Sequence, residues 1–469
     1  MLEERFTETK ETQPELLAHH YTEAGLIKQA IPYWQQAGEH AVTRSANEEA
    51  ISHLTKGLEL LKTFPETQER AQQELQLQLA LAPPLMGTRG YAAPELAPIY
   101  ARVRELSRQI GETPELSSIL YNLAAFYLGR AELHTSRELS EQLFTLAQRT
   151  QDPLALLRGH FVMVVILHKR GELVEAREHA EQGIRLYNRY RSQRSPWGAH
   201  HMGVGCLDCI TWVLWLLGYP DQALRRAQEA LVMAQEMAHP MTLAEALGYL
   251  ARFYQNLGER QAAEERANAT VTLCIEQGFP LWRAEGIIVQ GWALVEQGQE
   301  EKGVAQIRQG LPDYQATGTA LILPESLALL ATVEMKRGQT EEGLKTVIEA
   351  LARVEKSGGR MWEAELYRLR GELTLQQARQ EAKMTDPRPL APDPQGEAEA
   401  CFLKAIDIAR KQQAKSLELR MVMSLAKLWQ QQRKKKEAHE LLAEVYNWFT
   451  EGFNTKDLQE ARRLIEELS

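Results

Sequence analysis

The chain has 469 residues, of which 44% are hydrophobic and 25% are charged, which excludes a disordered or low-complexity chain. Its 54 lysines and arginines are outnumbered by 63 aspartates and glutamates, so we expect no nucleic-acid partner, because such binders carry a basic excess. The apolar run at 210–218 is too short to cross a bilayer and the four cysteines form no disulfide framework, so we expect a cytoplasmic protein with reduced thiols and no membrane partner.

The first 112 residues predict N-terminal helical repeats with a weak signature. Helical periodicity places the helices near 28–43, 46–63, 67–83 and 92–110. The segment from Leu16 to Gly25, followed by Ala30, also has the turn spacing of the later repeats. Two registers for the first helices therefore stay open.

Residues 113–376 contain a regular internal repeat. An apolar helical segment ends at a small turn residue, and a second small residue follows five positions later. The pairs are Gly171 with Ala176, Gly218 with Ala223, Gly258 with Ala263, Gly298 with Gly303, and Gly338 with Gly343. Successive turns are 47, 40, 40 and 40 residues apart, and Ala131 with Ser136 lies 40 residues before the first turn. Such a period predicts a repeat architecture.

A third small residue precedes the turn by seven positions, at Ala124, Ala251, Gly291, Ala331 and Ala426. Small residues at these positions let two antiparallel helices approach closely, while larger apolar residues fill the gaps between them. A single pair cannot bury its apolar face alone, so we expect the pairs to stack into a superhelix. The sequence shows no strand-like alternation, and the predicted fold is all-α.

A proline-rich stretch interrupts the last part of the chain. Residues 377–396 include four prolines within 387–394, and a helix cannot continue through that density of proline. We expect a flexible loop over 377–396, inserted within one repeat. C-terminal repeats and a capping helix are expected over 397–469, where Arg433 and Ala438 fit the turn spacing.

The spacing resembles that of the tetratricopeptide repeat (TPR), which has a small residue in its first helix, glycine at the turn and alanine early in its second helix. The period here is about 40 residues rather than about 34, which implies helices longer by roughly one turn. The resemblance implies a TPR-like α-solenoid, a right-handed superhelix of antiparallel helix pairs.

A closer resemblance covers almost the whole chain. It is carried by PELLAHHYTEAG (14–25), GYAAPEL (90–96), LLGYPDQAL (216–224), EQGFPLW (276–282), MWEAELYRLRGEL (361–373), QQAKSLELRMVMSLAKLW (412–429) and YNWFTEGFNTKDLQEARRLIEEL (446–468). These stretches are similar to the C-terminal helical arm of bacterial signalling proteins that join a class III adenylate/guanylate cyclase domain to an AAA-type ATPase of the signal-transduction class. The family's catalytic parts lie upstream of its arm, so we expect a truncated gene product or a free-standing arm.

The motif search predicts a protein without catalytic activity. The phosphate-binding pattern GxxxxGK[ST], HExxH, GxSxG and the deaminase pattern are all absent from the sequence. We therefore expect no enzyme and no cofactor, but a scaffold or sensor arm that binds a protein or peptide partner, with a cyclase or ATPase module as one candidate. The alternative is a receptor that binds a small effector, a metabolite, in its concave groove.

The TPR resemblance also implies which side chains line that groove. The first helix of each repeat faces it at about 13, 10, 6, 3 and 2 residues before the turn. These offsets select Arg158, Phe161, His168, Lys169, Asp208, Trp212, Trp215, Glu245, Arg252, Gln255, Asn256, Glu285 and Trp292. Large aromatics beside fixed charges suit recognition of a peptide or small ligand, in which case we expect Trp212, Trp215, Arg252 and Trp292 to be partly exposed. The alternative is that the tryptophans pack between repeats.

Two further clusters have a structural and a functional interpretation. Cys206 and Cys209, after His200 and His201, have the spacing of metal ligands. Since no second CxxC occurs, we interpret the cysteines as buried core and expect no metal site. The stretch RYRSQR at 189–194 has the residue types that hold anions, and we interpret it as a solvated loop.

Overall fold

The computed structural model describes residues 13–111, 116–190, 197–383 and 393–469, which form 22 helices and no strand. The first of these helices are α3 (Pro14–Glu23), α4 (Ile27–Thr43), α5 (Asn47–Leu61), α6 (Gln68–Arg89), α7 (Leu96–Ile110), α8 (Leu116–Gly129), α9 (Leu133–Thr150), α10 (Pro153–Arg170), α11 (Leu173–Tyr190), α12 (Trp197–Leu216) and α13 (Pro220–Glu236). The remaining helices are α14 (Pro240–Leu257), α15 (Arg260–Gln277), α16 (Pro280–Glu296), α17 (Glu300–Ala316), α18 (Leu323–Lys336), α19 (Thr340–Ser357), α20 (Glu363–Glu381), α21 (Pro394–Lys411), α22 (Lys415–Gln431), α23 (Lys435–Tyr446) and α24 (Lys456–Leu468).

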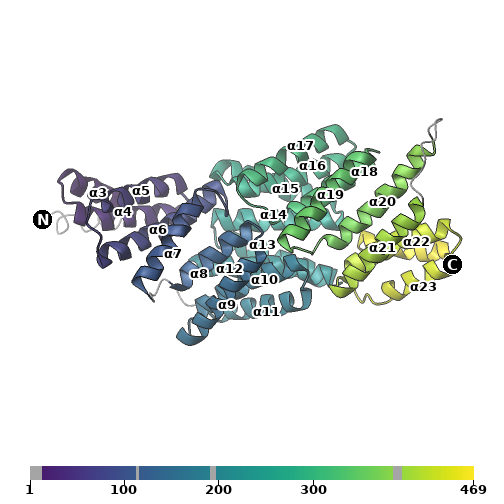
Figure 1. Cartoon of the computed structure of the whole chain (residues 1–469), viewed down its shortest axis with the longest axis horizontal. Coiled ribbons are helices and arrows are strands. Elements are labelled where there is room, and N and C mark those ends of the chain that lie inside the picture. The colour runs from purple at the N-terminus through teal and green to yellow at the C-terminus, as the bar shows by residue number, and fades with distance from the viewer. Residues whose placement is uncertain (1–12, 112–115, 191–196, 384–392) are drawn as a thin grey trace.

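The helices form a solenoid in which each element packs against the next along the chain. Figure 1 shows the stack extended along one axis, with the two ends of the chain at opposite ends of the molecule. The expected all-α, TPR-like solenoid is therefore confirmed. None of the helices in the described ranges is long and apolar enough to span a membrane.

The predicted turns are present. Gly171 and Gly258 end α10 and α14 in the left-handed conformation, with φ of 79° and 72°, where glycine avoids the steric cost of a Cβ. Ala131 and Arg433, chosen by spacing alone, also have positive φ, at 58° and 65°. The repeat register read from the sequence is thus correct on both sides of the proline-rich stretch.

The small residues allow close helix packing, as expected. Ala251 of α14 and Ala263 of α15 are fully buried in the same apolar cluster. In the α16–α17 pair, a Cβ added to Gly291 would lie 2.7 Å from the carbonyl oxygen of Gly303. The two backbones approach so closely because neither position carries a side chain.

Two expected boundaries differ from the structure. Helix α6 continues through Pro83 and Pro84 to Arg89, because a proline removes a donor without always ending the helix. The proline-rich stretch is shorter than 377–396: α20 runs to Glu381 and α21 begins at Pro394, while residues 384–392 lie outside the described ranges. At the start of the chain, the turn at Gly25 joins α3 to α4 and Ala30 is buried, so this pair has the repeat spacing.

Successive turns of the superhelix contact each other. The amide of Ala320 donates to the carbonyl of Gly129 at 2.8 Å, and the amide of Met361 donates to the carbonyl of Lys169 at 3.0 Å. Further along, Ser416 Oγ donates to the carbonyl of Trp215, 201 residues away. Turns of early repeats therefore contact segments about five repeats later, and helices α12 and α22 touch.

Candidate functional site

The inner face of the C-terminal half encloses a cavity of about 420 Å³, which we call the concave cavity. Residues of α14, α16, α18, α20, α22 and α24 line it, and all but α24 are first helices of their repeats. Its cationic residues are Arg252, Lys336, Arg368, Arg420, Lys427 and Lys456, and its acidic residues are Glu285, Glu296, Glu325, Glu365, Glu372, Asp457 and Glu460. The lining thus carries both charges in nearly equal number.

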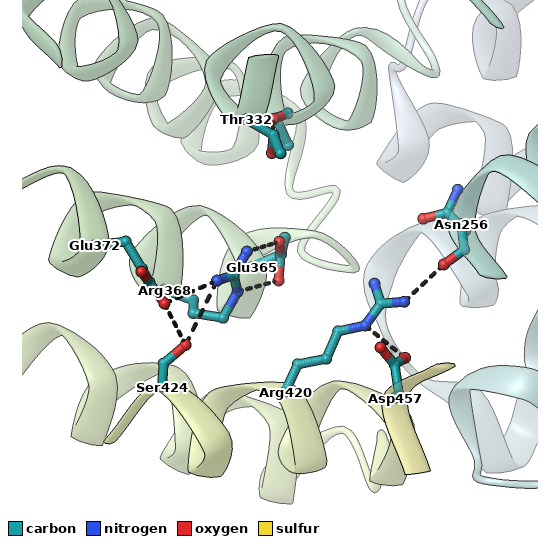
Figure 2. A network of polar contacts seen from close by, with 9 residues as sticks. Asn256, Thr332, Glu365, Arg368, Glu372, Arg420, Ser424 and Asp457 are labelled. Atoms are coloured by element: carbon teal, nitrogen blue, oxygen red, sulfur yellow. Dashed lines mark hydrogen bonds and ion pairs between the residues drawn. The ribbon is translucent and has the colours of Figure 1, made fainter. Parts of the chain in front are cut away.

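One wall of the cavity is a hydrogen-bonded cluster on α20 and α22. Arg368 donates to both carboxylate oxygens of Glu365, at 2.6 and 2.9 Å, and to Glu372 at 3.2 Å. Ser424 donates to the same oxygen of Glu372 at 2.6 Å. Figure 2 shows Thr332 of α18 opposite this cluster, and both line the concave cavity.

Arg420 joins three helices at the other side of the cavity. It donates to Asp457 of α24 at 2.8 Å and to the backbone carbonyl of Asn256 at the end of α14, at 2.6 Å (Figure 2). Its guanidinium also lies 5.1 Å from the centre of the Trp215 ring. A planar guanidinium suits this combination of a carboxylate, a carbonyl and an aromatic face, so Arg420 holds two superhelical turns together.

The floor of the cavity is a buried ionic network centred on Glu325. Lys169 donates to it at 2.9 Å, Trp362 Nε1 donates to it at 2.9 Å, and Arg252 forms an ion pair with it. Burial by itself would raise the pKa of Glu325, but the charges of Lys169 and Arg252 outweigh it and lower the pKa below its usual value. Arg252 also pairs with Glu285 at 3.1 Å.

Three further acids, Asp208, Glu245 and Glu285, are buried near this network. Burial raises the pKa of Asp208 well above its usual value, with only partial opposition from Arg252, and one oxygen of Asp208 has no hydrogen-bond partner. Burial also raises the pKa of Glu245, and the charges of Asp208 and Glu285 raise it further. Burial raises the pKa of Glu285 too, against a partial opposing effect of Arg252. The interior therefore favours the neutral form of these acids.

The predicted groove residues divide into two groups. Arg252, Gln255, Asn256, Glu285 and Trp292 line the concave cavity together. The others do not line it: His168, Lys169, Asp208, Trp212, Trp215 and Glu245 are buried elsewhere, Phe161 is half-buried, and Arg158 lines a separate cavity.

The expected exposure of four of these side chains is wrong. Trp212 and Trp215 are each 2% exposed, Trp292 is 6% exposed and Arg252 is 8% exposed. Trp215 is covered by α22 of a later superhelical turn. Trp212 packs edge-on against Trp215 of its own helix and Phe253 of α14, so the packing alternative describes these two tryptophans.

Several lining residues were missed by the sequence analysis, although the same spacing would have found them. Counting back 13, 6 and 2 positions from the turn at Gly338 gives Glu325, Thr332 and Lys336, and all three line the cavity. Counting back 13 from Arg433 gives Arg420. The offsets apply to these later repeats too, where the selection had not been extended.

The remaining candidates are structural or undescribed. Cys206 and Cys209 are buried in the apolar core, and burial raises the pKa of Cys206 to about 12. The side chains of His200 and His201, and residues 191–196 of the arginine-rich stretch, lie outside the described ranges. Within those ranges, no three His, Cys, Asp or Glu side chains cluster as metal ligands.

Comparison with known proteins shows the fold but no family. No family model matches the chain. An uncharacterised protein of Rhizobium meliloti (strain 1021) is 24% identical over 360 residues, which cover 76% of this chain and 34% of that protein. The chain therefore spans about a third of the length of the curated relative it matches.

Among solved structures, a Rap protein complexed with competence and sporulation factor superposes with a TM-score of 0.56 at 12% identity, covering 81% of this chain and 98% of that one. A signal-transduction ATPase with a tetratricopeptide repeat sensor from Pyrococcus horikoshii gives a TM-score of 0.44 at 13% identity, over 85% and 55% of the two chains. At such identity the first likeness shows the fold alone, that of TPR-like helical repeat proteins, and the second adds nothing to it.

Proposed function

We propose that the chain is a non-catalytic TPR scaffold or sensor arm in bacterial signalling, whose concave cavity takes a segment of a protein or peptide partner. The observation that carries the proposal is the mixed charge of the cavity lining. A polyanion would require a lining of one sign. A polypeptide segment offers donors, acceptors and charges of both signs, which six cations and seven carboxylates complement.

The geometry of the lining supports the same partner class. Asn256 and Gln255 present side-chain amides at the cavity, and an amide both donates to and accepts from a peptide backbone. Thr332 faces the Arg368 cluster without joining it (Figure 2). Recognition would therefore use polar groups that the fold already holds in place, which lowers the ordering cost of binding.

The similarity to the arm of cyclase–ATPase proteins extends this proposal. The matched relative is longer than this chain, which supports an arm that acts beside other domains. The Rap protein, which has the same fold, was solved in complex with competence and sporulation factor. We propose by analogy that occupation of the cavity biases an attached or associated cyclase–ATPase module.

Selection from a displayed peptide library on the immobilised full chain tests the cavity. Selected peptides should bind the wild-type chain and lose at least tenfold in affinity for Thr332→Trp, which fills the cavity. The matched control is Ile348→Trp, on α19, where the native side chain is 61% exposed on the outer helix layer. Failure to enrich any peptide, or binding that is insensitive to Thr332→Trp, would contradict the proposal.

A further inference from the structure

A second cavity of about 590 Å³ lies in the N-terminal half, which we call the N-terminal cavity. It shares no lining residue with the concave cavity. Its wall is largely apolar and comes from α4, α6, α8, α10, α12 and the starts of later helices. The principal apolar residues are Val42, Leu79, Met86, Met202, Met241 and Phe279. Its volume is within the range of small-molecule sites.

One cation, Arg158 of α10, lines this cavity. Its Nη1 donates to Ser118 Oγ at 2.9 Å, and its guanidinium lies 5.5 Å from the centre of the Tyr121 ring. Its Nε is buried and has no hydrogen-bond partner. Among the residues that the structure describes, no carboxylate forms an ion pair with it, unlike Arg252 or Arg368 in the other cavity.

The lining of the cavity offers this charge little compensation. The only acidic residue of the lining is Glu39, which is exposed and accepts a hydrogen bond from Gln35. His239 also lines the cavity, but burial lowers its pKa to about 4, so it is neutral at pH 7. Burial lowers the pKa of Arg158 as well, against a smaller opposing effect of Tyr121 and Asp152. A partly desolvated cation without an ion-pair partner is costly, and a bound anion would offset that cost.

We propose that the N-terminal cavity binds an amphipathic organic acid, with its carboxylate on Arg158 and Ser118 and its apolar body against the methionines and Phe279. The same chemistry is offered by a free medium-chain acid and by the C-terminal carboxylate of an apolar peptide. A guanidinium without an ion-pair partner, beside a hydroxyl and an apolar wall, matches both parts of such a molecule.

Calorimetric titration of the full chain tests this proposal with octanoate and octanamide, which differ in charge but hardly in shape. Octanoate should bind at least tenfold more tightly than octanamide, because hydrogen bonds to a charged partner are the stronger ones. An acetylated Leu-Leu-Phe peptide with a free or an amidated C-terminus forms the second arm and distinguishes the two sources. Equal binding of acid and amide in both arms would overturn the proposal.

The variants identify the residue responsible. Arg158→Met should reduce the affinity for octanoate to that for octanamide, whereas a preserved preference for the acid would overturn the assignment. The matched control is Arg177→Met: Arg177 lies 5.6 Å from the Tyr219 ring but pairs with Glu181, outside the cavity, so its loss should leave octanoate binding unchanged.

Two further variants keep the test decisive. If circular dichroism shows that Arg158→Met does not fold, Ser118→Ala replaces it, because it removes one contact to the carboxylate. Ser118→Ala should weaken the binding of octanoate but not that of octanamide. Equal effects on the binding of both would overturn the proposal. Thr332→Trp in the concave cavity should not change octanoate binding, which separates this proposal from that for a polypeptide partner.

Discussion

Replacing Glu325 by glutamine should strongly destabilise the protein. The carboxylate is the common partner of Lys169 and Arg252, and both cations are buried, with side-chain exposures of 10% and 9%. Lys169 has no other ion-pair partner in the described part of the chain, whereas Arg252 keeps Glu285. The substitution therefore leaves a lysine charge buried without compensation.

The magnitude follows from that burial. Removing one partner of a buried ion pair costs about 3–5 kcal/mol. We expect about 3 kcal/mol for Glu325→Gln, since the amide oxygen still accepts from Trp362. An exposed pair is worth about 0–1 kcal/mol, so Glu296→Gln is the matched control. Glu296 of α16 pairs with Lys336, which is on α18 as Glu325 is, and the two side chains are 26% and 47% exposed.

Urea unfolding followed by circular dichroism measures both variants, and the pH dependence provides a second check. The folded-state pKa of Glu325 is below its ordinary value of 4.5. Its contribution is therefore present above the unfolded pKa and is lost as the pH falls through the folded pKa. The difference between wild type and Glu325→Gln should shrink as the pH falls below 4.5. If Glu325→Gln costs no more than Glu296→Gln at pH 7, the buried network is not a stabilising centre.

Three further substitutions test the interior. Burial raises the folded-state pKa of Asp208, so the wild type loses stability as the pH rises through that pKa. Asp208→Asn should therefore raise the melting temperature at pH 8 and not near pH 4. A lower melting temperature at pH 8 would contradict the assignment. Trp212→Ala should cost about 3–5 kcal/mol in urea unfolding, because the buried ring leaves a cavity beside Phe253; a cost below about 1 kcal/mol would indicate an exposed ring. Gly303→Ala should cost about 1–3 kcal/mol, since its methyl would meet the backbone of Gly291, and unchanged thermal unfolding would refute the close α16–α17 packing.

The repeat and its turns could be predicted from sequence because they depend on local geometry. A turn residue such as Gly258 and small residues such as Ala251 and Ala263 are needed wherever two helices approach closely, so each repeat displays them. The extent of α6 could not be predicted this way. Pro83 and Pro84 weaken a helix locally, but packing of its apolar residues lets the helix continue to Arg89.

The site could be predicted only in part. The offsets correctly select inner-face positions such as Arg252 and Trp292, because side-chain direction repeats with the helix register. Contacts between successive superhelical turns depend on the angle between neighbouring repeats, which accumulates over about five repeats and which the repeat period does not encode. The contact between Ser416 and Trp215, 201 residues apart, is the product of that angle.

Hydrogen exchange of the full chain, with and without a library-selected peptide, tests the docking proposal most directly. Binding in the concave cavity predicts slower amide exchange in the inner helices around it, α14, α18, α20 and α22, and unchanged exchange in the outer helices α15, α17 and α19. Protection confined to the outer helices would contradict the proposal, because the peptide would then occupy the convex face.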